Sequence, residues 1–308
     1  MTSATAPASA NAMTAADIAT AAQLACLLEV SAPKPGNVSP GRHFGDTRYE
    51  HFLASAAAIG GPMGSAATRP VGETVRLAIE ATARWTASNT NLGIVLLFAP
   101  LARAGGADGV RPPHGVRPPD TERLKVRDAL RGVLEATTVE DARDVYAAIR
   151  LAAPGGLGRA DAQDVATEPT LPLLDVMKIA ADRDGIAREY ATGFEVTFEI
   201  GAPALVAARH DGLSWDDAIV ETFLRILAAQ PDTHIARRGG EATAADVSRR
   251  ARAALAAGGV RSASGRVAID EMDRALRDAD NTANPGTTAD LTAAAIFVVL
   301  VEGGWRGV

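Results

Sequence analysis

The residues best suited to chemistry in this chain lie in short polar segments that interrupt alanine-rich, apolar sequence. Five such segments span residues 29–46, 88–93, 154–164, 182–189 and 232–240, and a further one, 281–290, leads into an apolar stretch. They supply carboxylates, asparagines and a few cations, which are the groups that hold Mg2+ and phosphates together. No HExxH, CxxC or paired-histidine motif occurs, so a zinc site is not expected.

The first segment places a lysine between two prolines. Lys34 is one of three lysines in the chain, and Pro33 and Pro35 stiffen the backbone on either side of it. A point cation on a stiff loop before Gly36 suits a phosphate group. The alternative is a proline-rich helix terminator that carries a solvated lysine.

Two other segments have plain structural alternatives. Residues 88–93 could be an N-cap cluster, although a helix N-terminus also binds anions. The glycines of 154–158 are not followed by the Gly-Lys-Ser/Thr of a phosphate loop. Asp290 could simply be the acid of a capping box.

Helix signals dominate the rest of the chain. Ser or Thr precedes an acid by three residues at 14–17, 47–50, 138–141, 214–217, 243–246 and 287–290, which predicts helix starts. Further helices are expected near 72–88, 90–103, 121–135, 173–182, 185–208 and 261–280. Only 195–200 alternates as a strand would, within a segment that also fits a helix. We therefore predict an all-α fold: one large multi-helix domain over 13–308, with its site where helix ends and loops converge.

Composition narrows the class of protein. The net charge of −6 argues against nucleic-acid binding, and Cys26 is more typical of a buried apolar residue than of a catalytic thiol. Residues 1–12 predict a disordered tail without signal-peptide features. Residues 104–120 predict a Pro/Gly-rich surface loop. The apolar stretch 291–301 is shorter than the about 20 residues that a bilayer requires. A cytoplasmic protein without membrane contact is expected, and an alanine-rich helical surface is compatible with a homodimer.

In order and spacing, the polar segments resemble the triphosphoribosyl-dephospho-coenzyme A synthase (CitG-like) family. The resemblance covers about residues 15–304 and rests on Lys34-Pro-Gly-Asn-Val38, Asn89-Thr-Asn-Leu-Gly93, Gly155-Gly-Leu-Gly158, Asp232-Thr-His234 with Arg238-Gly-Gly240, and Asn284-Pro-Gly-Thr-Thr-Ala-Asp-Leu291. It implies an all-helical enzyme that joins the triphosphoribosyl unit of ATP to the 2′-hydroxyl of 3′-dephospho-coenzyme A and releases adenine. It also implies Mg2+ as cofactor and small molecules as the only substrates.

Glycosyl transfer of this kind requires negative charge near the ribose, a base for the incoming hydroxyl and cations for the triphosphate. We assign catalytic roles to Asp232, Asp290 and Glu29. The expected metal ligands are Asp46, Asp182, Glu189 and Asp232. The expected substrate-binding residues are Lys34, Asn37, Ser39, His43, Asn91, Arg238, Gly239, Gly240, Asn284 and Thr288.

Two positions depart from the family pattern and mark the chain as a divergent member. Asn91 and Leu92 stand where a His-Lys pair is common, and His234 stands where asparagine is expected. Two alternatives therefore stay open. One is a related nucleotide-dependent enzyme that acts on another acceptor in one-carbon cofactor biosynthesis, of the methanopterin or methanofuran type. The other is a helical nucleotide-binding protein without catalysis.

Overall fold

The computed structural model describes residues 13–106, 126–156, 158–278, 281–303 and 305, and this part of the chain is helical without a β-strand. The all-α prediction is confirmed. The first helices are α1 (Ala15–Ser31), α2 (Tyr49–Ala58), α3 (Gly60–Gly64), α4 (Val71–Ala83), α5 (Leu92–Gly105), α6 (Val126–Glu135), α7 (Val139–Ala152), α8 (Leu173–Ala180) and α9 (Gly185–Thr192). A π-helix, η2 (Val196–Gly201), is followed by α10 (Ala202–His210), α11 (Trp215–Ala229), α12 (Thr233–Gly239), α13 (Glu241–Ala256), α14 (Ala263–Leu276) and α15 (Gly286–Gly303).

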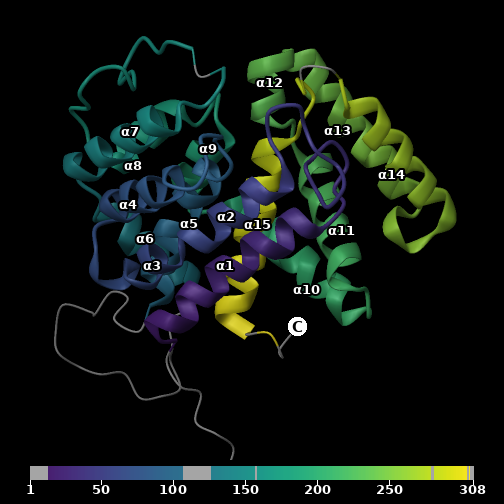
Figure 1. Ribbon diagram of the computed structural model, residues 1–308, viewed down its shortest axis with the longest axis horizontal. Coiled ribbons are helices and arrows are strands. Elements are labelled where there is room, and N and C mark those ends of the chain that lie inside the picture. Colours follow the sequence, from purple (N-terminus) through teal and green to yellow (C-terminus); the bar gives the residue numbers. More distant parts are fainter. Residues whose placement is uncertain (1–12, 107–125, 157, 279–280, 304, 306–308) are drawn as a thin grey trace, which may run out of the picture.

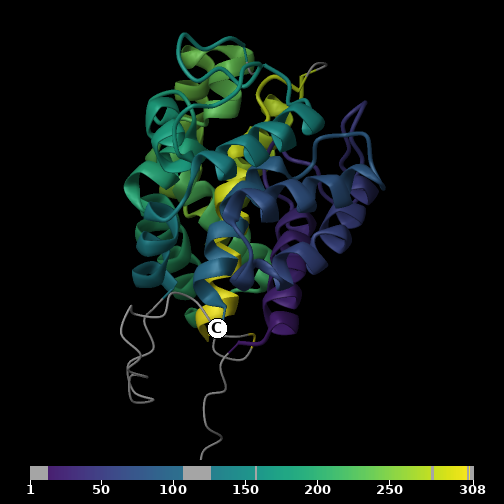
Figure 2. The same cartoon turned by 90° about the vertical axis from the view of Figure 1, so that its left-hand side faces the viewer.

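Helix α15 runs through the middle of the molecule. In Figure 1 it separates α3 to α9 on one side from α10 to α14 on the other, and Figure 2 shows it at the centre in a view turned by 90°. It packs against α1, α5, α10 and α11. The last helix of the chain is therefore the one around which the others assemble.

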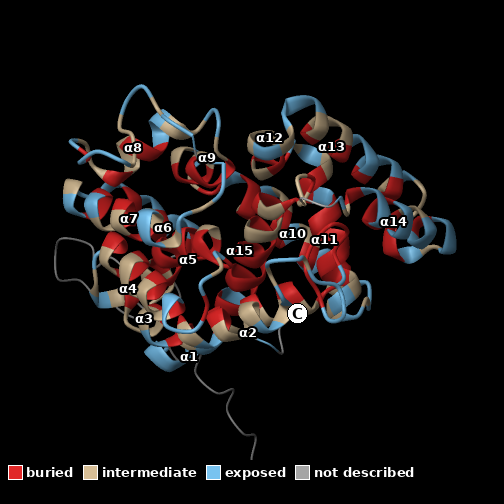
Figure 3. Ribbon diagram, turned by 45° about the horizontal axis from the view of Figure 1, so that its top comes forward, coloured by how far each residue is buried: buried red, intermediate tan, exposed pale blue. Residues whose placement is uncertain are grey.

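Small side chains let the neighbours approach α15 closely. Ala293, Ala294 and Ala295 are fully buried, and a Cβ placed on Gly201 would lie 2.8 Å from the Cβ of Ala295. Phe98 of α5 stacks on Phe297 of α15, with ring centroids 4.6 Å apart. Figure 3 shows the buried residues concentrated on α5, α11 and α15.

The apolar stretch at 291–301 belongs to a helix longer than predicted. Helix α15 has 18 residues and would be long and apolar enough to cross a membrane, yet 72% of it is buried inside the protein. Its apolar surface is already covered by other helices, so its role in this fold is that of a core helix.

Capping signals predicted helix starts correctly where the cap is local. Thr14 and Thr138 each form a full capping box with the acid three residues on, and Ser214 caps α11. Helices also begin near 47, 243 and 287, at Tyr49, Glu241 and Gly286, but the predicted threonine is not the N-cap residue there. The predicted tail 1–12 and residues 107–120 of the predicted loop lie outside the described residues, and α5 extends through Gly105.

The helix predicted over 185–208 is interrupted, and Glu189 explains how the interruption is stabilised. Its carboxylate is fully buried and accepts bonds from Val196 N (2.9 Å), Thr197 N (2.9 Å) and Thr197 Oγ1 (2.5 Å). These groups open η2, which replaces the strand-like alternation at 195–200. Burial raises the pKa of Glu189, and the three bonds oppose that shift. Glu189 therefore caps η2, while its expected role as a metal ligand stays a prediction.

Replacing Glu189 with alanine should destabilise the protein by about 3 kcal/mol, because three donors would lose a buried acceptor. Urea unfolding followed by circular dichroism would measure the change in the free energy of unfolding. Glu195→Ala is the matched control, since Glu195 is an exposed glutamate in the same segment. Equal stability of the two variants would contradict the capping role.

Candidate active site

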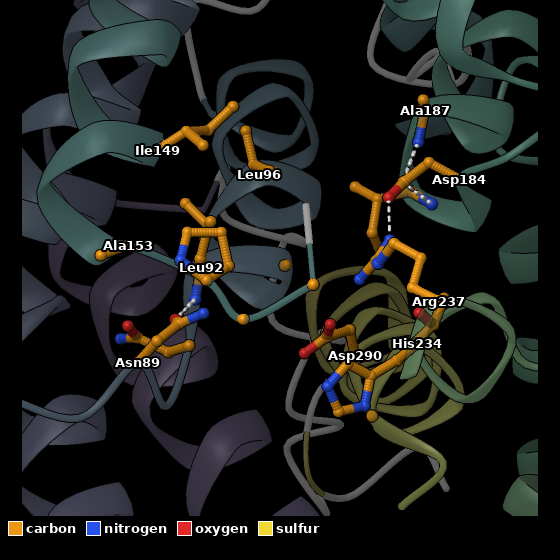
Figure 4. A pocket seen from close by; sticks show the side chains of 18 of the residues that line it. Asn89, Leu92, Leu96, Ile149, Ala153, Asp184, Ala187, His234, Arg237 and Asp290 are labelled. Carbon is orange, nitrogen blue, oxygen red and sulfur yellow. Dashed lines mark hydrogen bonds and ion pairs between the residues drawn. The ribbon is translucent and has the colours of Figure 1, made fainter. Parts of the chain in front are cut away.

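A large cavity lies where the ends of several helices and their loops meet. It has a volume of about 1350 Å3 and is lined by the C-terminal end of α1, the N-terminal ends of α5, α9 and α15, and residues of α7, α8 and α12. Figure 4 shows an apolar flank with Leu92, Leu96 and Ile149 facing a polar flank with Asp184, Arg237, His234 and Asp290. Helix ends converge here, as the sequence predicted.

The cavity gathers part of the predicted site. Among the expected residues, those lining it are Glu29, Asn37, Asp46, Asn91, Arg238, Asn284 and Asp290. Those outside its lining are Lys34, Ser39, His43, Asp182, Glu189, Asp232, Gly239, Gly240 and Thr288. Several members of the second group have structural roles that explain their positions.

Lys34 is buried and turned away from the cavity. It is 1% exposed, its ammonium group lies 3.0 Å from Glu29 Oε1, and it donates to the carbonyl oxygens of Glu29 and Ala32. A cation at these carbonyls satisfies the C-terminal end of α1 and favours its dipole. We therefore reassign Lys34 from the triphosphate to the positioning of Glu29.

Glu29 presents a carboxyl group to the cavity from the last turn of α1. It is 4% exposed. Burial raises its pKa, and the attraction of Lys34 works in the opposite direction. The ion pair with Lys34 thus favours a carboxylate in a place where burial alone would favour the neutral acid.

Asp232 links two helices through both of its carboxylate oxygens. Its Oδ1 accepts from His234 N (2.8 Å) and Ile235 N (3.0 Å), and its Oδ2 accepts from Thr288 N and Thr288 Oγ1, both at 2.7 Å. It is 2% exposed, so it caps α12 and ties α12 to the first turn of α15. This arrangement gives Asp232 a role in linking the two helices and explains the burial of Thr288, while its expected role as a base or a metal ligand stays a prediction.

Asp290 stands on the first turns of α15 and reaches the cavity. A Cβ on Gly93 would lie only 2.0 Å from Asp290 Oδ2, so the carboxyl group occupies the space that the missing side chain leaves at the start of α5. Its pKa is raised well above the usual value by burial first, then by the charges of Glu29, Asp232 and Asp184, with Arg237 opposing. It does not form the expected capping box with Thr287, because Thr287 lies inside α15.

Two asparagines meet at the cavity wall. Asn37 Nδ2 donates to Asn284 Oδ1 over 2.6 Å, and Arg277 Nη2 donates to the carbonyl of Asn37 over 2.7 Å. Asn37 is 5% exposed, and among the described residues its Oδ1 has no hydrogen-bond partner. A buried acceptor without a partner is costly, and a ligand hydroxyl could satisfy it.

His234, at the family's expected asparagine position, contacts this pair. Its Nδ1 lies 3.0 Å from the carbonyl oxygen of Asn284, and burial lowers its pKa. A neutral ring that donates from Nδ1 to this carbonyl leaves Nε2 as an acceptor. The departure from the family pattern therefore lies in the site itself.

Residues 89–93 form part of the cavity wall. Asn91 precedes α5 and donates from Nδ2 to Thr82 Oγ1 (3.0 Å), while Asn89 Oδ1 accepts from Leu92 N (3.2 Å). Asn91 is thus partly occupied in holding α5 against α4. The N-terminal end of α5 stays at the cavity.

The remaining expected residues are dispersed. Asp46 is exposed at the cavity and Asp182 is exposed outside its lining. His43 is exposed, and its Nδ1 accepts from Tyr49 N over 3.2 Å. Ser39 is buried outside the lining. Within the described residues, no three histidine, cysteine or acidic side chains are grouped to hold a metal ion. The predicted set of Asp46, Asp182, Glu189 and Asp232 therefore does not assemble.

Sequence reasoning found Arg238 but missed the other three arginines of a cluster at the opening of the cavity. Arg159 and Arg183 are exposed lining residues close enough to Asp164 to lower its pKa, after the hydrogen bonds from Ala160 N and Ala166 N. Arg237 Nη1 donates to Asp184 Oδ2 over 2.5 Å, and Arg238 follows it on α12. The paired arginines before Gly239 were a visible signal; the other two come from separate loops.

The comparisons with known proteins agree with this geometry. A family model described as CitG: ATP:dephospho-CoA triphosphoribosyl transferase matches residues 15–307, and the chain belongs to this family. A probable 2-(5''-triphosphoribosyl)-3'-dephosphocoenzyme-A synthase of Pseudomonas aeruginosa (strain UCBPP-PA14) is 39% identical over 127 residues, 40% of this chain and 43% of that protein. The 2-(5''-triphosphoribosyl)-3'-dephosphocoenzyme-A synthase of Klebsiella pneumoniae is 34% identical over 119 residues, 39% of this chain and 42% of that protein.

A solved structure shares the fold along most of the chain. It is described as a candidate triphosphoribosyl-dephospho-CoA synthase from Archaeoglobus fulgidus, with a TM-score of 0.61 and 30% identity. The match covers 82% of this chain and 99% of that one. In the two curated relatives above, by contrast, the matched region spans about two fifths of their length.

Replacing Asp232 with asparagine should lower the free energy of unfolding by about 2–3 kcal/mol, because an amide group cannot accept all four bonds. Asp270→Asn, an exposed change on α14, is the control. Urea unfolding would compare the two. Unchanged stability together with lost activity would return Asp232 to a catalytic role.

Proposed function

We propose that this protein transfers the 5-triphosphoribosyl unit of ATP to the 2′-hydroxyl of 3′-dephospho-coenzyme A and releases adenine. Family membership over residues 15–307 supports the reaction class. The observation that carries the proposal is one cavity that combines the carboxyl groups of Glu29 and Asp290, an unsatisfied asparagine oxygen and an arginine cluster at its opening.

The size of the cavity fits a reaction between two nucleotides. Its volume of about 1350 Å3 exceeds the roughly 300–1,000 Å3 of a pocket for one drug-sized ligand. The apolar flank can cover a base or a pantetheine arm, and the polar flank can hold ribose and phosphates (Figure 4). Holding both reactants in one cavity supplies the proximity that group transfer requires.

The triphosphate is assigned to Arg159, Arg183, Arg237 and Arg238. Guanidinium groups bind phosphate oxygens with two parallel hydrogen bonds. Two of the four arginines lie on α12, and the other two come from separate loops that line the cavity. Arg238 retains the role expected from the sequence, whereas Lys34 does not. With the triphosphate at the exposed arginines, the ribose extends inward to the buried acids.

The ribose is assigned to Asn37 and Asn284, beside Glu29. The unpaired Oδ1 of Asn37 would accept a bond from a sugar hydroxyl. Glu29, held by Lys34, would supply negative charge to an oxocarbenium-like transition state and act as the base for the acceptor hydroxyl.

Magnesium is proposed to enter as part of the Mg–ATP substrate. Mg2+ keeps several waters and takes oxygens from substrate phosphates, so it does not need a cage of protein carboxylates. This agrees with the dispersed positions of the acids expected to bind it. A cytoplasmic location, where ATP is abundant, is part of the same proposal, and the homodimer stays a prediction.

Incubation with ATP, Mg2+ and 3′-dephospho-coenzyme A tests the function directly. Chromatography should show adenine and a coupled product in equal amounts, with mass spectrometry placing the triphosphoribosyl unit on the acceptor. ADP or AMP in place of adenine would refute glycosyl transfer. Adenine formed only with a different acceptor would refute the assigned substrate.

Replacing Arg183 with alanine should raise KM for ATP at least about tenfold, because one charge-assisted phosphate contact is worth roughly 1.5–3 kcal/mol. KM for the acceptor should change much less. Arg131→Ala, an exposed change on α6, provides the control. An effect confined to the acceptor would place the triphosphate elsewhere.

A further inference from the structure

Asp290 differs from every other carboxyl group that lines the cavity in the described part of the chain. Glu29 is paired with Lys34, and Asp184 with Arg237. Asp164 accepts from Ala160 N and Ala166 N, and Asp46 from Thr47 Oγ1. Within the described residues the carboxyl group of Asp290 has no hydrogen bond or ion pair, although it reaches the cavity beside Gly93.

The groups around Asp290 come from three other helices. Those facing it are Glu29 and Cys26 of α1, Asp184 at the start of α9, and Asp232, His234 and Arg237 at and along α12. Three of them are acids, and Arg237 is already bonded to Asp184. A negative charge at Asp290 would be repelled by the three acids.

Glu29 and Asp290 therefore form an unequal pair of acids. Glu29 has a bonded cation that favours its charged form, and among the described residues Asp290 has none. When two carboxyl groups share a site and their environments differ, one serves as an acid and the other as a base or charge stabiliser. Here one cavity contains a carboxyl group beside a cation, that of Glu29, and one that the described residues leave without such a partner, that of Asp290.

We propose that Asp290 is the general acid that protonates N7 of the adenine leaving group, a role that rests on the transferase function proposed above. Leu92 and Leu96 face Asp290 across the cavity and can cover a purine ring, which would bring its N7 edge toward the acid (Figure 4). The sequence assigned Asp290 a catalytic role without saying whether it gives or takes a proton; a base would require an ionised carboxylate.

The step balances without a further reactant. The bond between C1′ of the ribose and N9 of adenine breaks, and its electron pair goes to the purine, which takes the proton of Asp290 at N7. The acceptor hydroxyl forms the new bond to C1′ and gives its proton to Glu29. Neutral adenine leaves, and proton exchange with water restores both carboxyl groups.

Gly93 sets the position of this acid. Any side chain at residue 93 would overlap Asp290, because its Cβ would stand 2.0 Å from Oδ2 of that carboxyl group. Gly93 of α5 and Asp290 of α15 thus together determine where the acid stands, although they are distant from each other in the sequence.

The test uses a donor that does not need an acid. In 7-methyl-ATP the purine already carries a positive charge and leaves without protonation at N7. Asp290→Asn should lower kcat with ATP by about 10²–10⁴-fold, the usual contribution of general acid catalysis, and should stay close to wild type with 7-methyl-ATP. Glu29→Gln is the matched contrast and should be impaired with both donors, because the acceptor hydroxyl still needs a base.

A pH profile of the wild-type enzyme tests the same role without a substitution. Asp290 holds its proton below its raised pKa, so kcat with ATP should fall as the pH rises through that value. The fall should be absent with 7-methyl-ATP. This measurement decides the matter if Asp290→Asn does not fold, which thermal melting would reveal.

The outcomes separate the two proposals. A wild-type protein that releases no adenine from ATP with dephospho-coenzyme A refutes the proposed function. An active wild type whose Asp290→Asn variant is equally impaired with both donors, or whose two pH profiles coincide, overturns the general-acid role alone.

Discussion

The hydrogen bonds of Asp232 fix the relation between α12 and α15, and the site depends on that relation. One carboxylate accepts backbone donors from the start of α12 and from the first turn of α15. Helix α12 carries His234, Arg237 and Arg238, and α15 brings Asp290. The buried carboxylate of Asp232 is stabilised only while all four hydrogen-bond donors stay in place, so α12 and α15 are held in a fixed relative position.

The cavity is graded in charge from its opening to its interior. Exposed arginines lie at the opening, and the buried Glu29 and the partly buried Asp290 lie within. Burial penalises charge, so the inner acids differ according to whether a cation accompanies them. A substrate that is strongly anionic at one end and reacts at its sugar matches this gradient.

Sequence patterns predicted the fold well because helix formation here is largely local. Thr14 and Thr138 cap their helices with acids three residues away, and periodicity located most of the other helices. The segment 185–208 was expected to be continuous because the break depends on Glu189, a side chain whose capping of η2 is established only on folding. The start of α15 was predicted to within two residues, but not its cap, because Asp232, a residue distant in the sequence, accepts from its first turn.

The candidate site was predictable in its location but not in its roles. Residue type identified Glu29, Asn37, Asn284 and Asp290 as polar groups in an apolar chain, and they share one cavity. Type alone could not show that Lys34 turns inward to α1, since the direction of a side chain is decided by burial. The arginines at 159 and 183 lie in the polar segments 154–164 and 182–189, but they were given no role because they fall outside the stretches that resemble the family.

The stacked rings of Phe98 and Phe297 join the same two helices whose first turns carry Gly93 and Asp290. The position of α5 along α15 is therefore set by two rings in the hydrophobic core, at a distance from the polar residues of the cavity. A change in the size of either ring would shift Asp290 relative to Gly93. Homologues should consequently exchange these two aromatic positions together, as a correlated pair.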